Sequence, residues 1–214
     1  TVGAVSQISS GYTRPEDVMM SSFSSWGPTD DGRIKPDVVA NGVNVMSSTG
    51  ASNNSYDVYS GTSMATPSVS GSLLLLQEYY AQKNGGNFMR SATLKALAIH
   101  TADEAGTSAG PDYKYGWGLL NTAKAAEVIR NNDQSHLLEE HVLNNGETFT
   151  LPVVASGNGT IKVTICWTDV KGAVTPVASA LNNNSKKLVN DLDVVIKRGA
   201  TIYRPWVLSA TVPG

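Results

Sequence analysis

The sequence has a single cysteine, no long hydrophobic run and no strong excess of either charge. One cysteine among 214 residues excludes an internal disulfide, and we expect Cys166 to be a small buried hydrophobe. The densest apolar run, residues 73–76, is far shorter than the roughly 18 residues that a membrane span needs. A net charge of −2 gives no electrostatic reason to expect a nucleic acid or an anionic membrane as partner. The length suits one large domain or two small ones.

Histidine is also scarce, and its distribution bears on function. The three histidines are His100, His136 and His141, so residues 1–99 contain none. His100 closes an expected helix, where a histidine is better explained by the helix dipole than by a catalytic role. The chain opens at Thr1 inside an apolar stretch and without a methionine, so we expect it to be a piece of a longer protein.

Apolar patterning predicts alternating strands and helices over residues 1–132. Strands are expected at residues 1–8, 34–40, 43–48 and 56–59, the first of them buried on both faces. A buried helix is expected at residues 69–80. A second helix is expected at residues 91–102, with one face formed by Leu94, Leu97, Ala98 and Thr101. A third helix is expected after Asn121 as its N-cap, with Ala125, Val128 and Ile129 facing inward. The Gly-Trp-Gly run at residues 116–118 lacks the rest of a dinucleotide fingerprint, so we interpret it as close packing.

The periodicity changes from 3.6 to 2 after the polar run at residues 131–135. Apolar residues alternate with polar ones at 149–153, 161–167 and 191–196, and glycine and asparagine clusters separate these runs. Residues 133–214 are therefore expected to form an antiparallel β-sandwich. Glu139 and Glu140 are expected at an exposed strand edge or turn. Asp191 and Asp193 share a strand face and could bind a structural calcium ion, although a solvated polar face explains them equally well.

The stretch that organises the chain is Gly61-Thr62-Ser63-Met64-Ala65-Thr66-Pro67. A turn of small residues that leads into a helix places free backbone N–H groups and the positive end of the helix dipole beside a serine hydroxyl. Those groups can stabilise the oxyanion of an acyl-transfer intermediate. Pro67 is expected in the first turn, where its missing N–H has no consequence. The simpler alternative is that Thr62 or Ser63 is only an N-cap.

The whole string, followed by Ser-Val-Ser-Gly, resembles the nucleophile motif of the subtilisin-like serine proteases (subtilases). Val-Gly-Ala-Val (2–5), Phe-Ser-Ser-x-Gly-Pro (23–28) and Lys-Pro-Asp-Val (35–38) follow the order of that family. The family usually has Ala-Pro-Gly where this chain has Asn41 before Gly42, and losing the proline should loosen that turn. Trp-Thr-Asp (167–169) and Leu-Val-Asn-Asp-Leu-Asp (188–193) resemble the β-sandwich appended to some bacterial subtilases.

The resemblance implies an α/β fold: the C-terminal part of a subtilase catalytic domain at residues 1–132 and an incomplete, jelly-roll-like sandwich at residues 133–214. It implies a serine endopeptidase in which Ser63 is the nucleophile and its own N–H forms part of the oxyanion hole, with no cofactor needed for the chemistry. The Gly61, Thr62, Met64 and Pro67 positions complete the motif.

The resemblance further implies polypeptide substrates and a secreted or cell-surface location. The family's aspartate and histidine are expected upstream of Thr1, in a missing N-terminal half that would be a partner of this chain. We therefore expect the chain alone to be inactive. The alternative is a degenerate protease remnant that acts as a binding or structural module.

Overall fold

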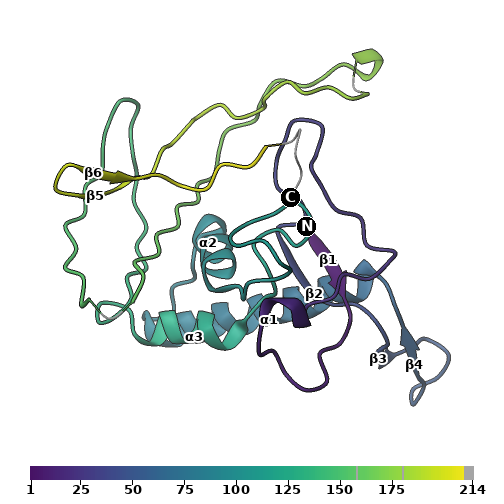
Figure 1. Ribbon diagram of the computed structural model, residues 1–214. Helices are drawn as coiled ribbons and strands as arrows, with labels where there is room; N and C mark the ends of the chain where they lie inside the picture. The colour runs from purple at the N-terminus through teal and green to yellow at the C-terminus, as the bar shows by residue number, and fades with distance from the viewer. Residues whose placement is uncertain (158, 180, 210–214) are drawn as a thin grey trace.

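The computed structural model describes residues 1–157, 159–179 and 181–209, which fold around a small α/β core (Figure 1). The regular elements, in chain order, are β1 (Val2–Val5), η1 (Pro15–Asp17), β2 (Val38–Asn41), β3 (Val45–Ser48), β4 (Tyr56–Tyr59), α1 (Thr62–Lys83), α2 (Ser91–Thr101), α3 (Thr122–Arg130), η2 (Val177–Ser179), β5 (Ile196–Arg198) and β6 (Thr201–Tyr203). Mixed α/β architecture with a parallel pair of strands agrees with the predicted fold class.

The parallel pair β1 and β2 forms the centre of the fold. Val2 pairs with Val38 and Val5 pairs with Asn41, and residues 118–120 continue the sheet through hydrogen bonds to Val39. Ala4 and Val5 are both buried, yet they belong to different hydrophobic clusters because successive side chains of a strand point to opposite faces. The prediction that the first strand is buried on both faces is confirmed for residues 3–5.

Helix α1 differs from the sequence prediction at its start and in its burial. It begins at Thr62 instead of residue 69, because threonine, serine, methionine and alanine continue the helical turn ahead of the apolar run. Val69 and Leu76 are buried, but Leu74 and Leu75 are 70% and 62% exposed. The run is apolar around the whole helix, whereas within the described residues only one side of the helix is covered, so the prediction of a buried helix is wrong for the other side.

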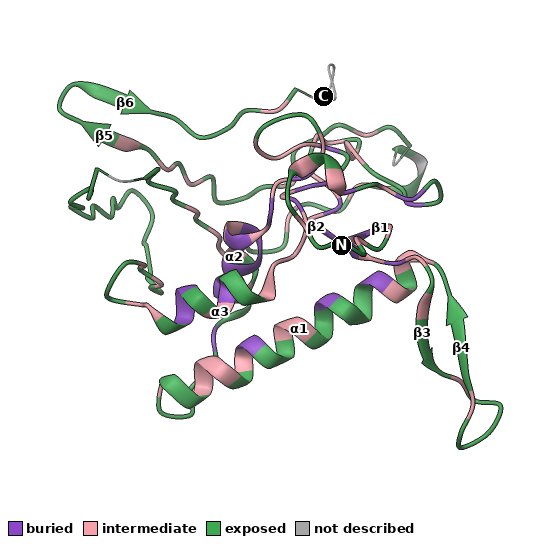
Figure 2. Ribbon diagram, turned by 60° about the horizontal axis from the view of Figure 1, so that its bottom comes forward, coloured by how far each residue is buried: buried purple, intermediate pink, exposed green. Residues whose placement is uncertain are grey.

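Helices α2 and α3 confirm their predicted faces. Leu97, Ala98 and Thr101 of α2 are buried, and so are all three inward positions predicted for α3. The two helices pack with the middle of α1 into one cluster, whose fully buried members are Leu76, Met89, Leu97, Ala125, Val128 and Ile129. Figure 2 shows buried residues on all three helices and the β3–β4 hairpin projecting away from them.

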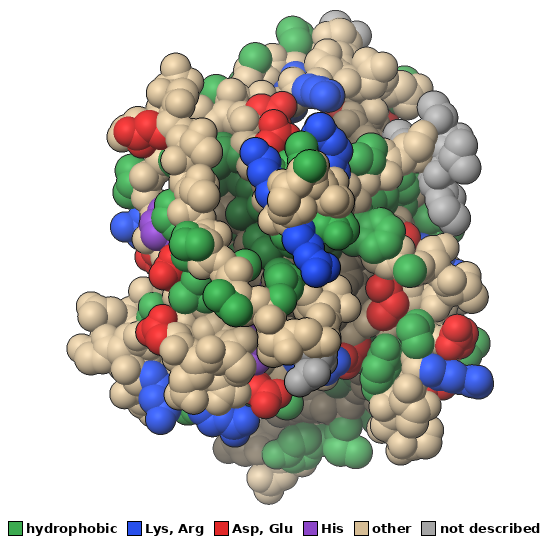
Figure 3. Space-filling view, turned by 60° about the vertical axis from the view of Figure 1, so that its left-hand side comes forward, with side chains coloured by type: hydrophobic (Ala, Val, Ile, Leu, Met, Phe, Trp, Pro, Cys, Tyr) green, Lys and Arg blue, Asp and Glu red, His purple; other side chains and the backbone are tan. Residues whose placement is uncertain are grey.

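The region beyond residue 132 does not confirm the expected β-sandwich. In the part of it that the structure describes, the only strands are β5 and β6, and the alternating runs at 149–153 and 161–167 are extended without strand pairing. Side chains that a sandwich would bury lie open, such as Val153 at 58% exposed. On the face shown in Figure 3, hydrophobic side chains are exposed between polar ones. The domain division after residue 132 stays a prediction. None of the helices within the described residues has the length and apolar character needed to cross a membrane.

Candidate active site

Ser63 lies in the first turn of α1, directly after the β3–β4 hairpin. The N-cap residue of the helix is Gly61, and in the part of the chain that the structure describes no side chain caps this end. Thr62 and Ser63 are inside the helix, so the alternative that one of them is merely an N-cap is wrong. The Ser63 side chain is exposed. A residue at this position presents its hydroxyl at the helix start, where the dipole is positive.

Two backbone N–H groups at this helix start have no partner among the described residues. Within the described residues no hydrogen bond is made by the N–H of Thr62 or of Ser63, whereas the Gly61 N–H donates to the Gly42 carbonyl at 2.7 Å. The first N–H groups of a helix have no partner inside it. Unpaired N–H groups at the positive end of a helix are the kind of donors that an oxyanion needs.

Gly42 fixes the serine loop to the central strands. A Cβ at this position would lie 2.6 Å from the Ala4 Cβ and 2.7 Å from the Gly61 carbonyl oxygen, so any side chain would push the loop away from β1. The preceding Asn41 accepts a hydrogen bond from the Val43 N–H at 3.1 Å. The turn lacks the proline that the resemblance leads one to expect, but this hydrogen bond from Val43 to the Asn41 side chain stabilises it.

The prediction for Pro67 is wrong. With α1 starting at Thr62, Pro67 lies in the second turn and interrupts the helix ladder. It has no N–H to donate to the Ser63 carbonyl four residues earlier. The proline therefore weakens the helix hydrogen bonding immediately behind the candidate nucleophile. Thr66 supports the same turn by donating its hydroxyl to the Thr62 carbonyl at 2.8 Å.

The described residues provide no general base for Ser63. No hydrogen bond connects its hydroxyl to a histidine or a carboxylate. His100 binds Thr164 through Nδ1 at 2.9 Å, and His141 binds Glu139 through Nε2 at 2.8 Å.

The expectation that His100 favours the helix dipole as a cation also needs correction. Burial, followed by the charges of Lys162 and His136, lowers the pKa of His100 below its ordinary value. The ring therefore favours its neutral form, in which it adds no positive charge to the helix end.

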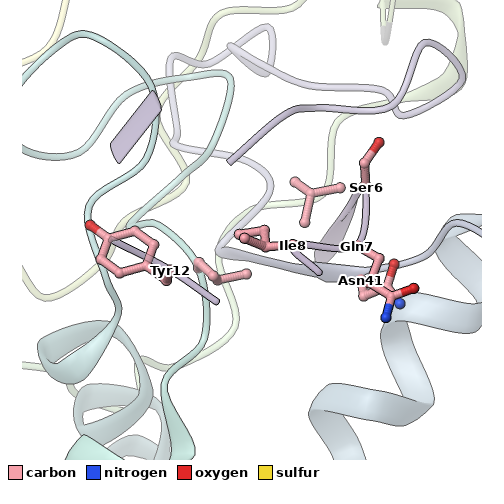
Figure 4. Close-up of a pocket in the computed structure, with 7 residues that line it drawn as sticks. Ser6, Gln7, Ile8, Tyr12 and Asn41 are labelled. Carbon is pink, nitrogen blue, oxygen red and sulfur yellow. The ribbon is translucent and has the colours of Figure 1, made fainter. Parts of the chain in front are cut away.

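A cavity of about 250 Å³ opens at the carboxyl ends of β1 and β2 (Figure 4). Gln7 and Asn41 lie together on one side of it and Tyr12 on the other, with Ile8 between them. The remaining lining residues are Val5, Ser6 and Leu119. Asn41 precedes Gly42 in the chain, so the cavity wall is one residue from the contact that holds the serine loop.

Asp191 and Asp193 are both exposed and alternate with the half-buried Leu192 and Val194, but they precede β5 and lie in no strand. Among the described residues, however, no group of three or more His, Cys, Asp or Glu side chains is arranged to hold a metal ion. Two carboxylates are well short of the six to eight oxygen ligands that calcium takes. The present arrangement does not fit the ion, and the calcium site stays a prediction.

Asp169 belongs to the Trp-Thr-Asp motif, but the sequence alone does not reveal what its carboxylate binds. It accepts hydrogen bonds from the Val189 N–H at 2.8 Å and from the side-chain amide of Asn190 at 2.7 Å. The Trp167 indole N–H donates to the Asn190 carbonyl at 3.1 Å. The Trp-Thr-Asp and Leu-Val-Asn-Asp-Leu-Asp motifs thus contact each other across more than twenty residues of chain. Only the fold brings them together, since neither motif predicts the other as its partner.

The first 118 residues match a known family model. The model is that of the subtilase family, and the match covers residues 1–118. The C5a peptidase of Streptococcus pyogenes is 52% identical over 61 residues, which are 28% of this chain and 5% of that protein. The PII-type proteinase of Lactococcus lactis subsp. cremoris is 40% identical over 80 residues, which are 37% of this chain and 4% of that protein. The chain thus spans a small fraction of the length of these relatives.

A solved structure shares the fold. The CspB protease of Clostridium perfringens superposes with a TM-score of 0.50 at 30% sequence identity, and the match covers 61% of this chain and 26% of that one.

Proposed function

The chain belongs to the subtilase family, and from that premise we propose that it carries the nucleophile of a serine endopeptidase, Ser63. At the level of the family the protein is a serine protease. The observation that carries the proposal is the position of Ser63, exposed in the first turn of α1 beside N–H groups that no described residue occupies.

The chemistry that we propose is acyl transfer through Ser63. Its Oγ attacks the carbonyl carbon of a peptide bond while a base takes the hydroxyl proton, and the carbonyl oxygen becomes an oxyanion. The Ser63 N–H at the positive helix end donates to that oxyanion. The amine leaves with a proton from the base, and water then hydrolyses the acyl ester on Ser63. Because the described residues contain no base in contact with the serine, we propose that histidine and its orienting aspartate come from a segment outside these 214 residues.

Polypeptides are the substrates that this chemistry implies, and the N-terminal part of a subtilase domain is the partner that would complete the site. The family resemblance favours a secreted or cell-surface location. The sandwich expected beyond residue 132 belongs to the same proposal. Its support is the contact between the two motifs at Asp169 and Asn190, which are the segments that resemble the appended sandwich.

The competing function is that of a degenerate remnant that serves as a binding or structural module. The remnant is favoured by the absence of a general base among the described contacts of Ser63. It would be excluded if another segment of the protein supplied that base. The two functions differ in a single measurable property, which is whether Ser63 reacts when the upstream segment is present.

Replacing Ser63 with alanine in the protein that includes the upstream segment tests the proposal. We expect peptide hydrolysis to fall on the order of 10⁶-fold, the loss known when the same serine is removed from subtilisin. The fold should persist because an exposed hydroxyl contributes little to packing.

Ser70→Ala is the matched control, since Ser70 is exposed on the same helix about two turns beyond Ser63. It should leave turnover unchanged. If Ser63→Ala kept a tenth of the activity, Ser63 would not be the nucleophile. If the unchanged protein had no activity and no reactive serine, the remnant would be the better description.

A further inference from the structure

Helix α2 is held at its N-terminal end by a residue from beyond the predicted domain boundary. Glu140 Oε1 accepts hydrogen bonds from the Arg90 N–H at 2.9 Å and from the Thr93 hydroxyl at 2.5 Å. Glu140 Oε2 also pairs with the Arg90 guanidinium at 3.0 Å. Arg90 is the N-cap position of α2, and its own side chain provides no cap. Glu140 therefore accepts from the N-cap N–H, as the acid of a capping box does. It is exposed, as expected, but it lies in neither a strand nor a turn.

The C-terminal end of α2 is held by the same region of the chain. The Lys162 ammonium donates to the His100 carbonyl at 2.5 Å, and Thr164 binds the His100 ring at 2.9 Å. Carbonyls in the last turn of a helix have no partner inside the helix, and a cation there suits the negative end of the dipole. The negative charge of Glu140 at the first turn and the positive charge of Lys162 at the last turn each stabilise the helix end that they contact.

We propose that Glu140, Lys162 and Thr164 form a clamp on the two ends of α2, and that protonation of His100 releases the clamp at its Lys162 end while the Glu140 end holds. The proposal concerns the folded chain itself and does not depend on the function of Ser63.

The charges around His100 give the direction of the effect. Lys162 and His136 face the ring, while Asp103, Glu104 and Lys124 act on Lys162 from the chain after α2 and from α3. Asp103 is engaged by Lys124 and by the Asn121 amide. A proton on the partly buried His100 therefore adds a second positive charge beside the exposed Lys162 ammonium. Thr164 can accept a hydrogen bond from either form of the ring, so repulsion and burial are what disfavour the docked state.

The pKa of His100 is lowered by burial first and then by Lys162. A histidine whose pKa is lower in the docked state than in the undocked state favours docking at pH values above its ordinary pKa of about 6.5. This preference for the docked state is lost as the pH falls toward the docked pKa. At Glu140, burial raises the pKa, but hydrogen bonds from Thr93 and Arg90 outweigh it, so the pKa lies below its usual value. Glu140 therefore keeps its charge in the range where His100 gains a proton.

Hydrogen exchange on the folded chain tests the clamp. Protection factors, corrected for intrinsic exchange, are measured for peptides covering 97–103 and 160–168 between about pH 7.5 and about pH 5, which bracket the ordinary histidine pKa. We expect both peptides to lose protection about tenfold for each pKa unit that separates docked from undocked His100. Peptides at the start of α2, beside Glu140, should keep theirs.

Variants separate the clamp from a general acid effect. His100→Asn cannot gain a proton and should abolish the acid loss, whereas His141→Asn, the matched control, should leave it as in the unchanged chain. Glu140→Gln should lower protection at the start of α2 at every pH. Lys162→Met should lower protection at 160–168 even at neutral pH and flatten its pH dependence. An equal acid loss in His100→Asn and the unchanged chain would overturn the proposal, as would full protection at about pH 5. If His100→Asn does not fold, an undiminished acid loss in Lys162→Met would overturn it equally.

Discussion

Gly118 occupies a backbone conformation and a space that exclude a side chain. Its φ of +110° lies in the region that favours glycine, and a Cβ built on it would be 2.0 Å from the Asp103 carbonyl oxygen. Its own carbonyl accepts the Val39 N–H at 3.0 Å, which joins the segment to β2. Residues 116–118 therefore bring the chain close to the central strands, and this agrees with interpreting the Gly-Trp-Gly run as packing.

Replacing Gly118 with alanine should destabilise the fold by about 3 kcal/mol or more, because both the backbone conformation and the contact with Asp103 must change. Gly71→Ala is the control, since Gly71 is exposed within α1 and no atom lies within 4 Å of the added Cβ. Alanine there should stabilise the helix by about 0.5–1 kcal/mol. Urea unfolding measures both values, and similar midpoints for the two variants would show that Gly118 is not constrained.

At the scale of the elements, α3 depends on a cap that also serves a buried charge. The Asn121 Oδ1 accepts the Lys124 N–H at 2.9 Å, and its amide donates to the Asp103 carboxylate at 2.8 Å. Asp103 is only 6% exposed, so its donors replace the water that it has lost. One side chain thus begins a helix and helps to satisfy a buried acid.

Asn121→Ala should lower the free energy of unfolding by about 2 kcal/mol, because it removes both the cap and a donor to a buried carboxylate. Asn121→Ser should lose less, since a serine keeps the capping oxygen without the amide donor. Chemical denaturation of the two variants and the unchanged chain checks this order. If the alanine and serine variants were equally stable, the cap would contribute nothing at this position.

The elements were predictable to different degrees, for physical reasons. The faces of α2 and α3 follow from 3.6-residue spacing, and β4 from its β-branched and aromatic residues, because these signals are local. The start of α1 was missed because small polar residues carry no periodic signal. The alternating runs after residue 132 predict which side chains share a face, but they do not specify a partner strand. At the site, the motif predicts the serine and its helix, while the role of Gly42 depends on Ala4 and Gly61. Outside the site, the roles of Glu140 and Asp169 likewise depend on residues distant in sequence.

At the scale of the whole molecule, α2 connects the two regions of the chain to the central strands. Its ends contact Glu140 and Lys162, and its middle presents Lys95 to the Asp37 carboxylate at 3.4 Å, immediately before β2. Asp37 also binds Lys35 at 2.7 Å. Burial raises the pKa of Asp37, but hydrogen bonds from Lys35 and the Thr1 ammonium and the charge of Lys95 outweigh burial, and the pKa lies well below its usual value. The carboxylate therefore stays charged, and the link between α2 and β2 persists across the pH range in which His100 titrates.

The chain of 214 residues should not be acylated at Ser63 when it is alone. Acylation needs a base within about 3 Å of the serine oxygen together with an orienting acid. His100 lies in α2 and could become that base only if α2 moved. Moving α2 would expose Leu97, now only 1% exposed, at a cost of about 1.5–3 kcal/mol for that side chain. It would also break the contact of His100 with Thr164. His141 is engaged with Glu139 in the region after the predicted boundary.

A fluorophosphonate probe measures this directly. The isolated chain, shown to be folded by circular dichroism, should label no more than its own Ser63→Ala variant, because an unactivated serine is a weak nucleophile. Addition of a separately expressed segment that carries the family's aspartate and histidine should raise labelling of the chain and leave the variant at background. Stoichiometric labelling of the isolated chain would mean that a base lies within these 214 residues after all. The probe reports the reactivity of Ser63 itself, so this result would not depend on which polypeptide the protease cleaves.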